Sequence, residues 1–208
     1  PDKILFDNIA FTLERGKCIA IIGKNGKGKS TLLNTIAGEL TQLSGTVERH
    51  ASIEYAHFGQ TNINRLNPKN SIIDEISLSN PKLSMPNIRS ICGGMMFSGD
   101  SAEKQISLLS GGERSRVMLG QILAKPANVL FLDEPTNHLD MDSIAALTTA
   151  IKKFKGATII VTHSEEMLRE IADQLIIFAK DGAQFFDGNY DDFLEKIGWE
   201  EEENEKKV

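Results

Sequence analysis

Two adjacent carboxylates, Asp133 and Glu134, follow an apolar run at residues 128–132, NVLFL. The run predicts a buried strand, and burying an ionised carboxylate costs free energy unless the charge is paired or held by a metal ion. A strand that ends at a polar surface, with Asp-Glu-Pro as a turn, is the simpler alternative. Two separate roles would explain the pair better: Asp133 holding a divalent cation and Glu134 acting as a general base.

A glycine-rich segment supplies the partner that these carboxylates need. Residues 23–30, GKNGKGKS, match the phosphate-loop pattern G-x-x-x-x-G-K-[ST], between a predicted strand and a predicted helix. In such a loop, backbone N–H groups and the positive end of the helix bind a polyphosphate. The alternative is a glycine-rich turn with incidental lysines, which would require neither the strand before it nor the helix after it. Lys29 would reach the β- and γ-phosphates, and Ser30 would hold Mg²⁺ together with Asp133. The predicted binding residues are Gly23, Lys24, Asn25, Gly26, Lys27, Gly28, Lys29, Ser30 and Thr31.

A third segment, LLSGGERSRV from Leu108, predicts a helix start with an unusual composition. Ser110 and Glu113 form an S-x-x-E capping box, which accounts for the serine and the glutamate. It does not account for Gly111 and Gly112, since each glycine in a helix costs up to about 1 kcal/mol relative to alanine. The two glycines indicate that an anion approaches the backbone closely at this helix end.

The bulk properties are those of an ordinary globular chain and leave room for one large domain. The chain has 208 residues, 40% of them hydrophobic and 25% charged, with a net charge of −6. No apolar run approaches the ~20 residues that span a bilayer, and no secretory signal opens the chain. Because Pro1 is not an initiator Met, it looks like the cut end of a longer chain. Cys18 and Cys92 read as reduced thiols of a cytoplasmic protein, with Cys18 in a strand core.

The elements that must position these residues alternate between strands and helices. Predicted strands cover 17–22, 45–50, 52–58, 128–132, 158–161 and 175–178, and predicted helices cover 29–37, 111–124, 142–154, 165–172 and 190–197. Continuous apolar strands separated by helices predict an α/β fold with a mostly parallel central sheet covered on both faces. The runs at 45–50 and 52–58 alternate like edge strands, which suggests an antiparallel β edge.

Two further regions depart from this alternation. Residues 61–110 contain three prolines and two short helical segments, near Ser71 and at 88–92, and are interpreted as a small helical insertion. Residues 199–208 form an acidic tail, and positions 200–208 carry −3 of the net charge. The expected organisation is one domain over 1–198 followed by this tail. The mildly acidic remainder argues against this domain alone binding nucleic acid.

Taken together, GKNGKGKS, LSGGE, VLFLDE and the histidine of IVTHS resemble an ATP-binding-cassette (ABC) ATPase domain, a fold of the P-loop NTPase type. The resemblance covers nearly the whole chain. It implies MgATP binding, hydrolysis to ADP and phosphate, and head-to-tail pairing with a second cassette in the same chain or in a homodimer. In such a pair the signature segment, Ser110, Gly111, Gly112 and Glu113, contacts the nucleotide held by the other cassette.

The resemblance also implies roles for single residues. Glu134 becomes the catalytic base, His163 the switch that contacts the γ-phosphate, and Gln60 a catalytic residue and metal ligand that senses Mg²⁺ and the attacking water. A surface glutamine and a structural histidine are the alternatives. Asp140 matches the aspartate that links the two sites of a dimer. The aromatic residue that stacks on adenine would fall at or before Pro1, because Phe6 and Phe11 read as core.

Several details resemble the ABC-F subfamily, whose duplicated, soluble cassettes act on ribosomes. These are EPTNHLD at 134–140, SGGE in the signature and FDGNYDDFLEK at 186–196. They imply the C-terminal half of a two-cassette cytoplasmic protein that reaches the ribosome and its rRNA through other parts of the full-length protein, with no membrane contact. The ATPase subunit of a membrane ABC transporter is the main alternative. An ATP-dependent switch with little turnover is another.

Overall fold

A single twisted sheet organises the residues that the computed structural model describes, namely 4–59, 66–137, 139–179 and 182–199. Its strands are β1 (Cys18–Gly23), β2 (Tyr55–Phe58), β3 (Val129–Asp133), β4 (Ala157–Val161), β5 (Gln174–Ala179) and β6 (Gly182–Phe186). Within these residues the strand order is β2-β3-β4-β1-β5-β6, and only the β5–β6 pair is antiparallel. The expected α/β fold with a mostly parallel sheet and an antiparallel edge is confirmed.

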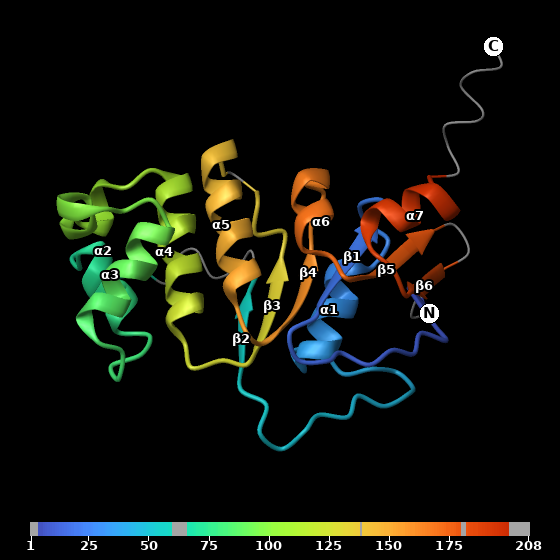
Figure 1. The fold of residues 1–208 in the computed structure, drawn as a ribbon. Coiled ribbons are helices and arrows are strands. Elements are labelled where there is room, and N and C mark those ends of the chain that lie inside the picture. Colours follow the sequence, from blue (N-terminus) through green and yellow to red (C-terminus); the bar gives the residue numbers. More distant parts are fainter. Residues whose placement is uncertain (1–3, 60–65, 138, 180–181, 200–208) are drawn as a thin grey trace, which may run out of the picture.

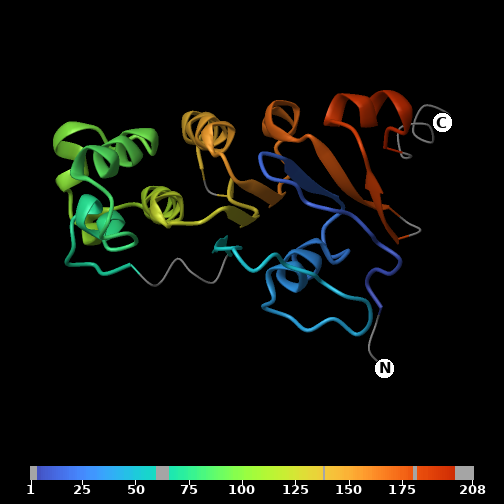
Figure 2. The same ribbon diagram turned by 60° about the horizontal axis from the view of Figure 1, so that its bottom comes forward.

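Helices cover both faces of this sheet (Figures 1 and 2). Helix α1 (Lys29–Ala37) packs on one face, and α5 (Met141–Lys153), α6 (Glu165–Ile171) and α7 (Tyr190–Lys196) pack on the other. Alternation along the strands divides the side chains between the two faces. In β1, Ile19 and Ile21 are buried against α1, whereas Ala20 and Ile22 are buried in the core on the opposite face. Each fully buried isoleucine contributes about 1.5–3 kcal/mol, so the central strands are firmly anchored.

The predicted insertion is helical and lies beyond the β2 edge of the sheet, on the left in Figure 1. It contains α2 (Ile72–Ser77), α3 (Met85–Gly94) and two short 3₁₀ turns, η2 (Gly99–Glu103) and η3 (Ile106–Leu108). Both α-helices pack against α4 (Gly111–Ala124), which leads the chain back to the sheet. Buried side chains such as Ile76 and Ile88 join this bundle to the larger core.

The strand predicted at 45–50 is wrong, because the structure has no regular element there. Instead of pairing with a strand, this segment is tied to the end of α1. The Nη2 of Arg49 donates a hydrogen bond to the Ile36 carbonyl at 2.5 Å and lies against Gly38. The antiparallel edge is therefore formed by β5 and β6 at the other side of the sheet, and β6 was not predicted. Edge strand β2 runs parallel to β3.

Helix starts explain why several predicted elements begin where they do. The capping box of Ser110 and Glu113 is present, and Asp140, Ser164 and Asn189 cap α5, α6 and α7 with their side chains. Helix α1 differs, because its N-cap is Gly28 in the left-handed region and no side chain caps it. The first N–H groups of α1 thus remain available to other acceptors.

Further expectations can be compared with the described residues. Cys18 is buried in β1, as predicted, and Cys92 is buried in α3. Phe6 and Phe11 pack against the core on the α1 side of the sheet. Trp199 is partly exposed, with its ring 5.1 Å from that of Phe193, a buried residue of the terminal helix. No helix in the described part of the chain has both the length and the apolar character needed to cross a membrane. The tail from 200 onward lies outside the described residues.

Candidate active site

The predicted phosphate loop (residues 23–30) joins the end of β1 to the start of α1 and depends on backbone conformations that favour glycine. Gly23 has φ 137° and lies so close to β5 that a Cβ there would be 2.5 Å from the Phe178 carbonyl oxygen. Gly26 has φ 75° but faces open space, and a Cβ added there would meet no atom within 4 Å. Close packing therefore requires glycine at 23, whereas backbone conformation alone favours it at 26.

Lys29 is a nearly buried cation held inside the loop. Its side chain donates hydrogen bonds to the carbonyls of Gly23 and Lys24, at 2.8 and 3.1 Å, and to Oδ1 of Asn25 at 3.3 Å. These acceptors match the three N–H bonds of an ammonium group. Burial lowers the pKa of Lys29, and the nearby carboxylates of Glu134 and Asp133 oppose that shift. The loop thus places a fixed positive charge beside the start of α1.

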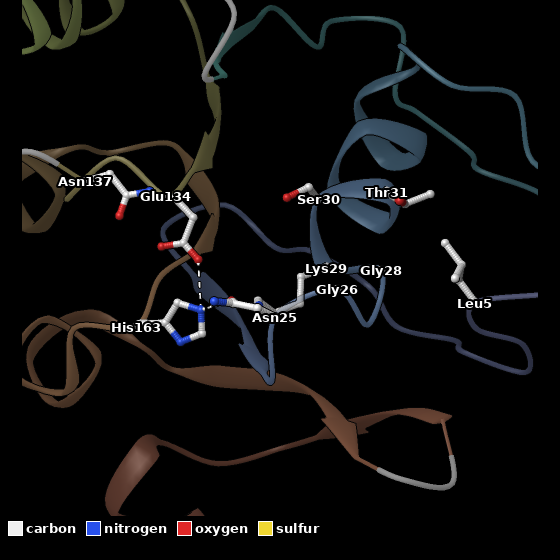
Figure 3. A pocket seen from close by; sticks show the side chains of 10 residues that line it. All are labelled: Leu5, Asn25, Gly26, Gly28, Lys29, Ser30, Thr31, Glu134, Asn137 and His163. Carbon is white, nitrogen blue, oxygen red and sulfur yellow. Dashed lines mark hydrogen bonds and ion pairs between the residues drawn. The ribbon is translucent and has the colours of Figure 1, made fainter.

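A cavity of about 410 Å³ opens beside the loop (Figure 3). It is lined by Leu5, Asn25, Gly26, Gly28, Lys29, Ser30, Thr31, Glu134, Asn137 and His163. The volume is in the usual range for small-molecule sites. In Figure 3, Glu134 and His163 lie at one end of the cavity and the aliphatic side chain of Leu5 at the other. The cavity is therefore graded, from charged and polar groups at one end to an apolar contact at the other.

Asp133 and Ser30 form a pair of oxygen donors. Asp133 ends β3 and is buried, and its Oδ1 accepts a hydrogen bond of 2.9 Å from Ser30 Oγ. In the described parts of the chain, no group of three or more His, Cys, Asp and Glu residues is arranged to hold a metal ion. Mg²⁺, however, commonly uses one or two protein oxygens together with phosphate oxygens. The Ser30–Asp133 pair therefore fits Mg²⁺ that arrives with a polyphosphate.

Glu134 occupies a strained position directly after β3. Its φ of 49° is in the left-handed region, which costs a non-glycine residue roughly 1–2 kcal/mol. A hydrogen bond of 2.9 Å from its N–H to the Val161 carbonyl holds it beside the end of β4. The side chain is 11% exposed. Burial raises the pKa of Glu134, with a smaller upward effect from Asp133 and an opposing effect from Lys29, so this carboxylate is a stronger base than an exposed one.

His163 links the carboxylate to the loop. Its Nε2 lies 3.1 Å from Oε1 of Glu134 and 2.8 Å from Oδ1 of Asn25 (dashed lines in Figure 3). Because both neighbours are acceptors, we assign the proton of the neutral ring to Nε2. Burial, followed by the positive charge of Lys29, lowers the pKa of His163. The imidazole is therefore neutral at pH 7 and donates a hydrogen bond into the cavity.

The structure gathers only some of the predicted residues. Besides the cavity-lining residues of the loop, it brings Glu134 and His163 together and places Asp133 behind Ser30. The signature segment does not line the cavity and begins α4 elsewhere. Lys24 and Lys27 do not line it either, and Gln60 lies outside the described residues. Leu5 and Asn137 were not predicted as site residues: no motif marks Leu5, and EPTNHLD at 134–140 contains Asn137 but was used only for the resemblance to a subfamily.

Comparisons with known proteins agree with this geometry. A family model described as "ABC transporter" matches residues 6–137. The chain is 36% identical over 192 residues to the probable ATP-binding protein YheS of Escherichia coli, covering 92% of this chain and 30% of that protein. It is 34% identical over 199 residues to the energy-dependent translational throttle protein EttA of Haemophilus influenzae, covering 93% of this chain and 36% of that one. It is 35% identical over 198 residues to ABC transporter F family member 2 of Arabidopsis thaliana, covering 94% of this chain and 29% of that one.

Solved structures agree on the fold. An RNase-L inhibitor superposes with a TM-score of 0.70 at 24% identity, covering 89% of this chain and 38% of that one. A putative ABC transporter ATP-binding protein from Pyrococcus furiosus gives a TM-score of 0.69 at 24% identity, covering 79% of this chain and 87% of that one. The chain spans only 29–36% of the length of the three relatives named above. Since the family model matches more than half of the chain, the chain belongs to the ATP-binding-cassette family, and its relatives include proteins of the ABC-F type.

Proposed function

We propose that this chain binds MgATP and hydrolyses it to ADP and phosphate, with Glu134 as the general base. The observation that carries the proposal is the mostly buried Glu134 carboxylate, which lies 3.1 Å from a histidine donor at one end of a cavity whose wall is the phosphate loop. A base with a raised pKa can accept a proton from a water molecule near neutral pH. The active site thus has a phosphate-binding part and a proton-accepting part.

Each remaining group has a part in this reaction. Lys29 and the N–H groups at the start of α1 bind the phosphate oxygens and place the terminal phosphate near Glu134. Ser30 and Asp133 would hold a magnesium ion, which would neutralise phosphate charge. His163 donates from Nε2, and this donor can turn from Asn25 to a phosphate oxygen. Glu134 then orients the water and takes its proton.

A second cassette completes the site in this proposal. Ser110–Glu113 lie outside the cavity of their own chain, and Gly111 is exposed, with no atom within 4 Å of a Cβ added there. This arrangement supports a head-to-tail pair in which the segment contacts the partner's nucleotide. The chain alone is then expected to hydrolyse ATP slowly. Phosphate release measured at increasing concentrations of the chain tests this, and fast turnover independent of concentration would contradict it.

The whole protein, we propose, acts on the ribosome as an ABC-F protein of the cytoplasm. In this proposal residues 1–198 form its C-terminal cassette, residues 199–208 form an acidic tail, and contacts with rRNA come from outside this chain. The support is the similarity to EttA, whose name describes a translational throttle, and to an ABC transporter F family member. Gln60 keeps its proposed role as a sensor of Mg²⁺ and water.

Co-sedimentation tests the ribosomal role directly. Salt-washed ribosomes are centrifuged with the full-length protein, with and without ATP, and the Glu134→Gln variant is expected to remain bound with ATP present. Full-length protein that stays in the supernatant under both conditions would contradict the ribosomal role. Co-purification with a membrane permease would instead favour the transporter ATPase.

A further inference from the structure

Arg116 joins three parts of the structure that are distant in the sequence. Its side chain is only 15% exposed, and Nη1 donates a hydrogen bond of 2.7 Å to Ser143 Oγ near the start of α5. The same nitrogen lies 3.9 Å from Asp140 Oδ2. The guanidinium group stacks 5.1 Å from the ring centroid of Phe97 in the insertion. This mostly buried guanidinium group of α4 therefore contacts both α5 and the insertion.

The contacts of Arg116 lie next to the signature segment on its own helix. Helix α4 begins directly after the Ser110 cap, so Arg116 is in its second turn and moves with the signature segment as one rigid element. Met96 lies beside this contact, with its Sδ 3.9 Å from Arg116 Nη1 and 3.7 Å from Ser143 Oγ, and its φ of 66° is in the left-handed region. A strained backbone is kept at the junction, which indicates a tightly determined geometry.

On the other side of the junction, hydrogen bonds connect the start of α5 to the backbone of Glu134. Asp140 caps α5 by accepting a hydrogen bond of 2.9 Å from the Ser143 N–H. Between this cap and β3, the Asn137 N–H donates to the Glu134 carbonyl and the Leu139 N–H donates to the Thr136 carbonyl. Two successive turns therefore join the α5 cap to the backbone of Glu134.

We propose that Arg116 is a positioning residue that fixes the Glu134 segment relative to the signature segment, and so couples the two nucleotide sites of a cassette pair. The inference rests on the proposed function, in which Glu134 serves the nucleotide of its own chain and Ser110–Glu113 serve that of the partner. Arg116 does not line the cavity of its own chain. Within one cassette it connects the Glu134 segment, which belongs to one nucleotide site of the pair, to the signature segment, which belongs to the other.

The test measures the two sites separately in the full-length protein. In one parent, Glu134 is the only intact catalytic glutamate, and in the other only the equivalent glutamate of the second cassette is intact. Three variants are made separately in each parent. Arg116→Met removes the contact, whereas Arg116→Lys and Ser143→Ala each remove less of it. Arg89→Met is the matched control, because it removes an exposed arginine whose 2.8 Å contact with Glu103 does not reach α5. For each protein, kcat, KM and the thermal unfolding midpoint are measured.

The expected result is a fall in kcat of at least about tenfold at both sites, the size associated with losing a hydrogen bond to a charged group, with KM for ATP unchanged. Arg116→Lys should also lower kcat, because an ammonium group lacks the planar fork that serves Ser143 and stacks on Phe97. If Arg116→Met does not fold, Arg116→Lys and Ser143→Ala decide the outcome. Slowing only at the site that uses this chain's signature segment would overturn the inference, as would no slowing at either site. If replacing Glu134 in the first parent leaves turnover unchanged, the proposed function is overturned, and the inference with it.

Discussion

Oε1 of Glu134 lies 3.1 Å from Nε2 of His163 because β3 and β4 are parallel neighbours in register. Asp133 is paired with Val161, so the residues that follow the two strands emerge at the same edge of the sheet. Parallel strands bring their carboxyl ends together, which is where α/β proteins bind ligands. The pairing of β3 with β4 therefore brings the Glu134 carboxylate and the His163 imidazole close together, and the loops that follow the strands set only their orientation.

The first prediction concerns the carboxylate of that pair. Glu134→Gln keeps the shape of the side chain but cannot accept a proton, so ATP hydrolysis is expected to fall by about 10²–10⁴-fold while ATP binding remains. Phosphate release and nucleotide titration on the full-length protein measure the two quantities. Glu166→Gln, at an exposed position in the first turn of α6, is the control and should retain full turnover. A Glu134→Gln protein as active as the parent would remove Glu134 from the mechanism.

The second prediction is a pH dependence of stability. Because burial raises the pKa of Glu134, the folded protein binds more protons at this site than the unfolded chain does between the ordinary and the raised pKa. The contribution of Glu134 to the free energy of unfolding therefore decreases as pH rises through that window. In denaturant titrations across the acid range, the free energy of unfolding of Glu134→Gln minus that of the parent should therefore rise with pH through this window. Identical profiles would argue against the raised pKa.

The third prediction compares two glycines of the phosphate loop. Gly23→Ala would place Cβ 2.5 Å from the Phe178 carbonyl oxygen, so β5 must shift, and we expect a loss of about 3 kcal/mol or more, in the range of disruptive core changes. Gly26→Ala meets no atom within 4 Å and carries only the left-handed strain of about 1–2 kcal/mol. Urea unfolding of both variants measures the difference. Equal losses would contradict the close contact with β5.

The fourth prediction separates two lysines of the same loop. Lys29→Met removes a buried charged donor, and ATP should bind about 10- to 150-fold more weakly, the equivalent of 1.5–3 kcal/mol. Lys27 is exposed and does not line the cavity, so Lys27→Met should cost only about a few-fold, as screened surface charges do. Calorimetric titration with MgATP gives both constants. A larger loss for Lys27→Met would mean that the phosphates lie outside the cavity.

The sequence predicted best those elements whose signal is local. Helices α1 and α4 begin and end at the predicted residues, because a phosphate-loop pattern and a capping box mark their starts. The prediction of a strand at 45–50 was wrong because alternation in a short polar run does not ensure that a neighbouring strand is available for pairing. Arg49 in this segment instead donates a hydrogen bond to the Ile36 carbonyl near the end of α1. Strand β6 was missed because GAQFF at 182–186 alternates too weakly to stand out beside β5.

Contacts between distant residues were beyond prediction from one sequence. The hydrogen bond between Asn25 and His163 and the contact of Arg116 with Ser143 each join segments whose proximity depends on the sheet order and on helix packing. The motifs named Asn25 and His163 as separate candidates, and no motif named Arg116. The chemistry of the site could be predicted from residue types, whereas its internal connections required coordinates.

Helix α1 begins at a glycine that offers its first N–H groups no side-chain oxygen, unlike the capped starts of α4, α5, α6 and α7. A glycine N-cap costs only about a few tenths of a kcal/mol relative to Ser, Thr, Asn or Asp at that position. An anion that binds these N–H groups takes the place of the missing oxygen and stabilises the folded chain. Anion occupancy and local order at this helix end therefore increase together. Nucleotide that binds at this helix end in the folded chain alone is therefore expected to raise the free energy of unfolding as its concentration rises.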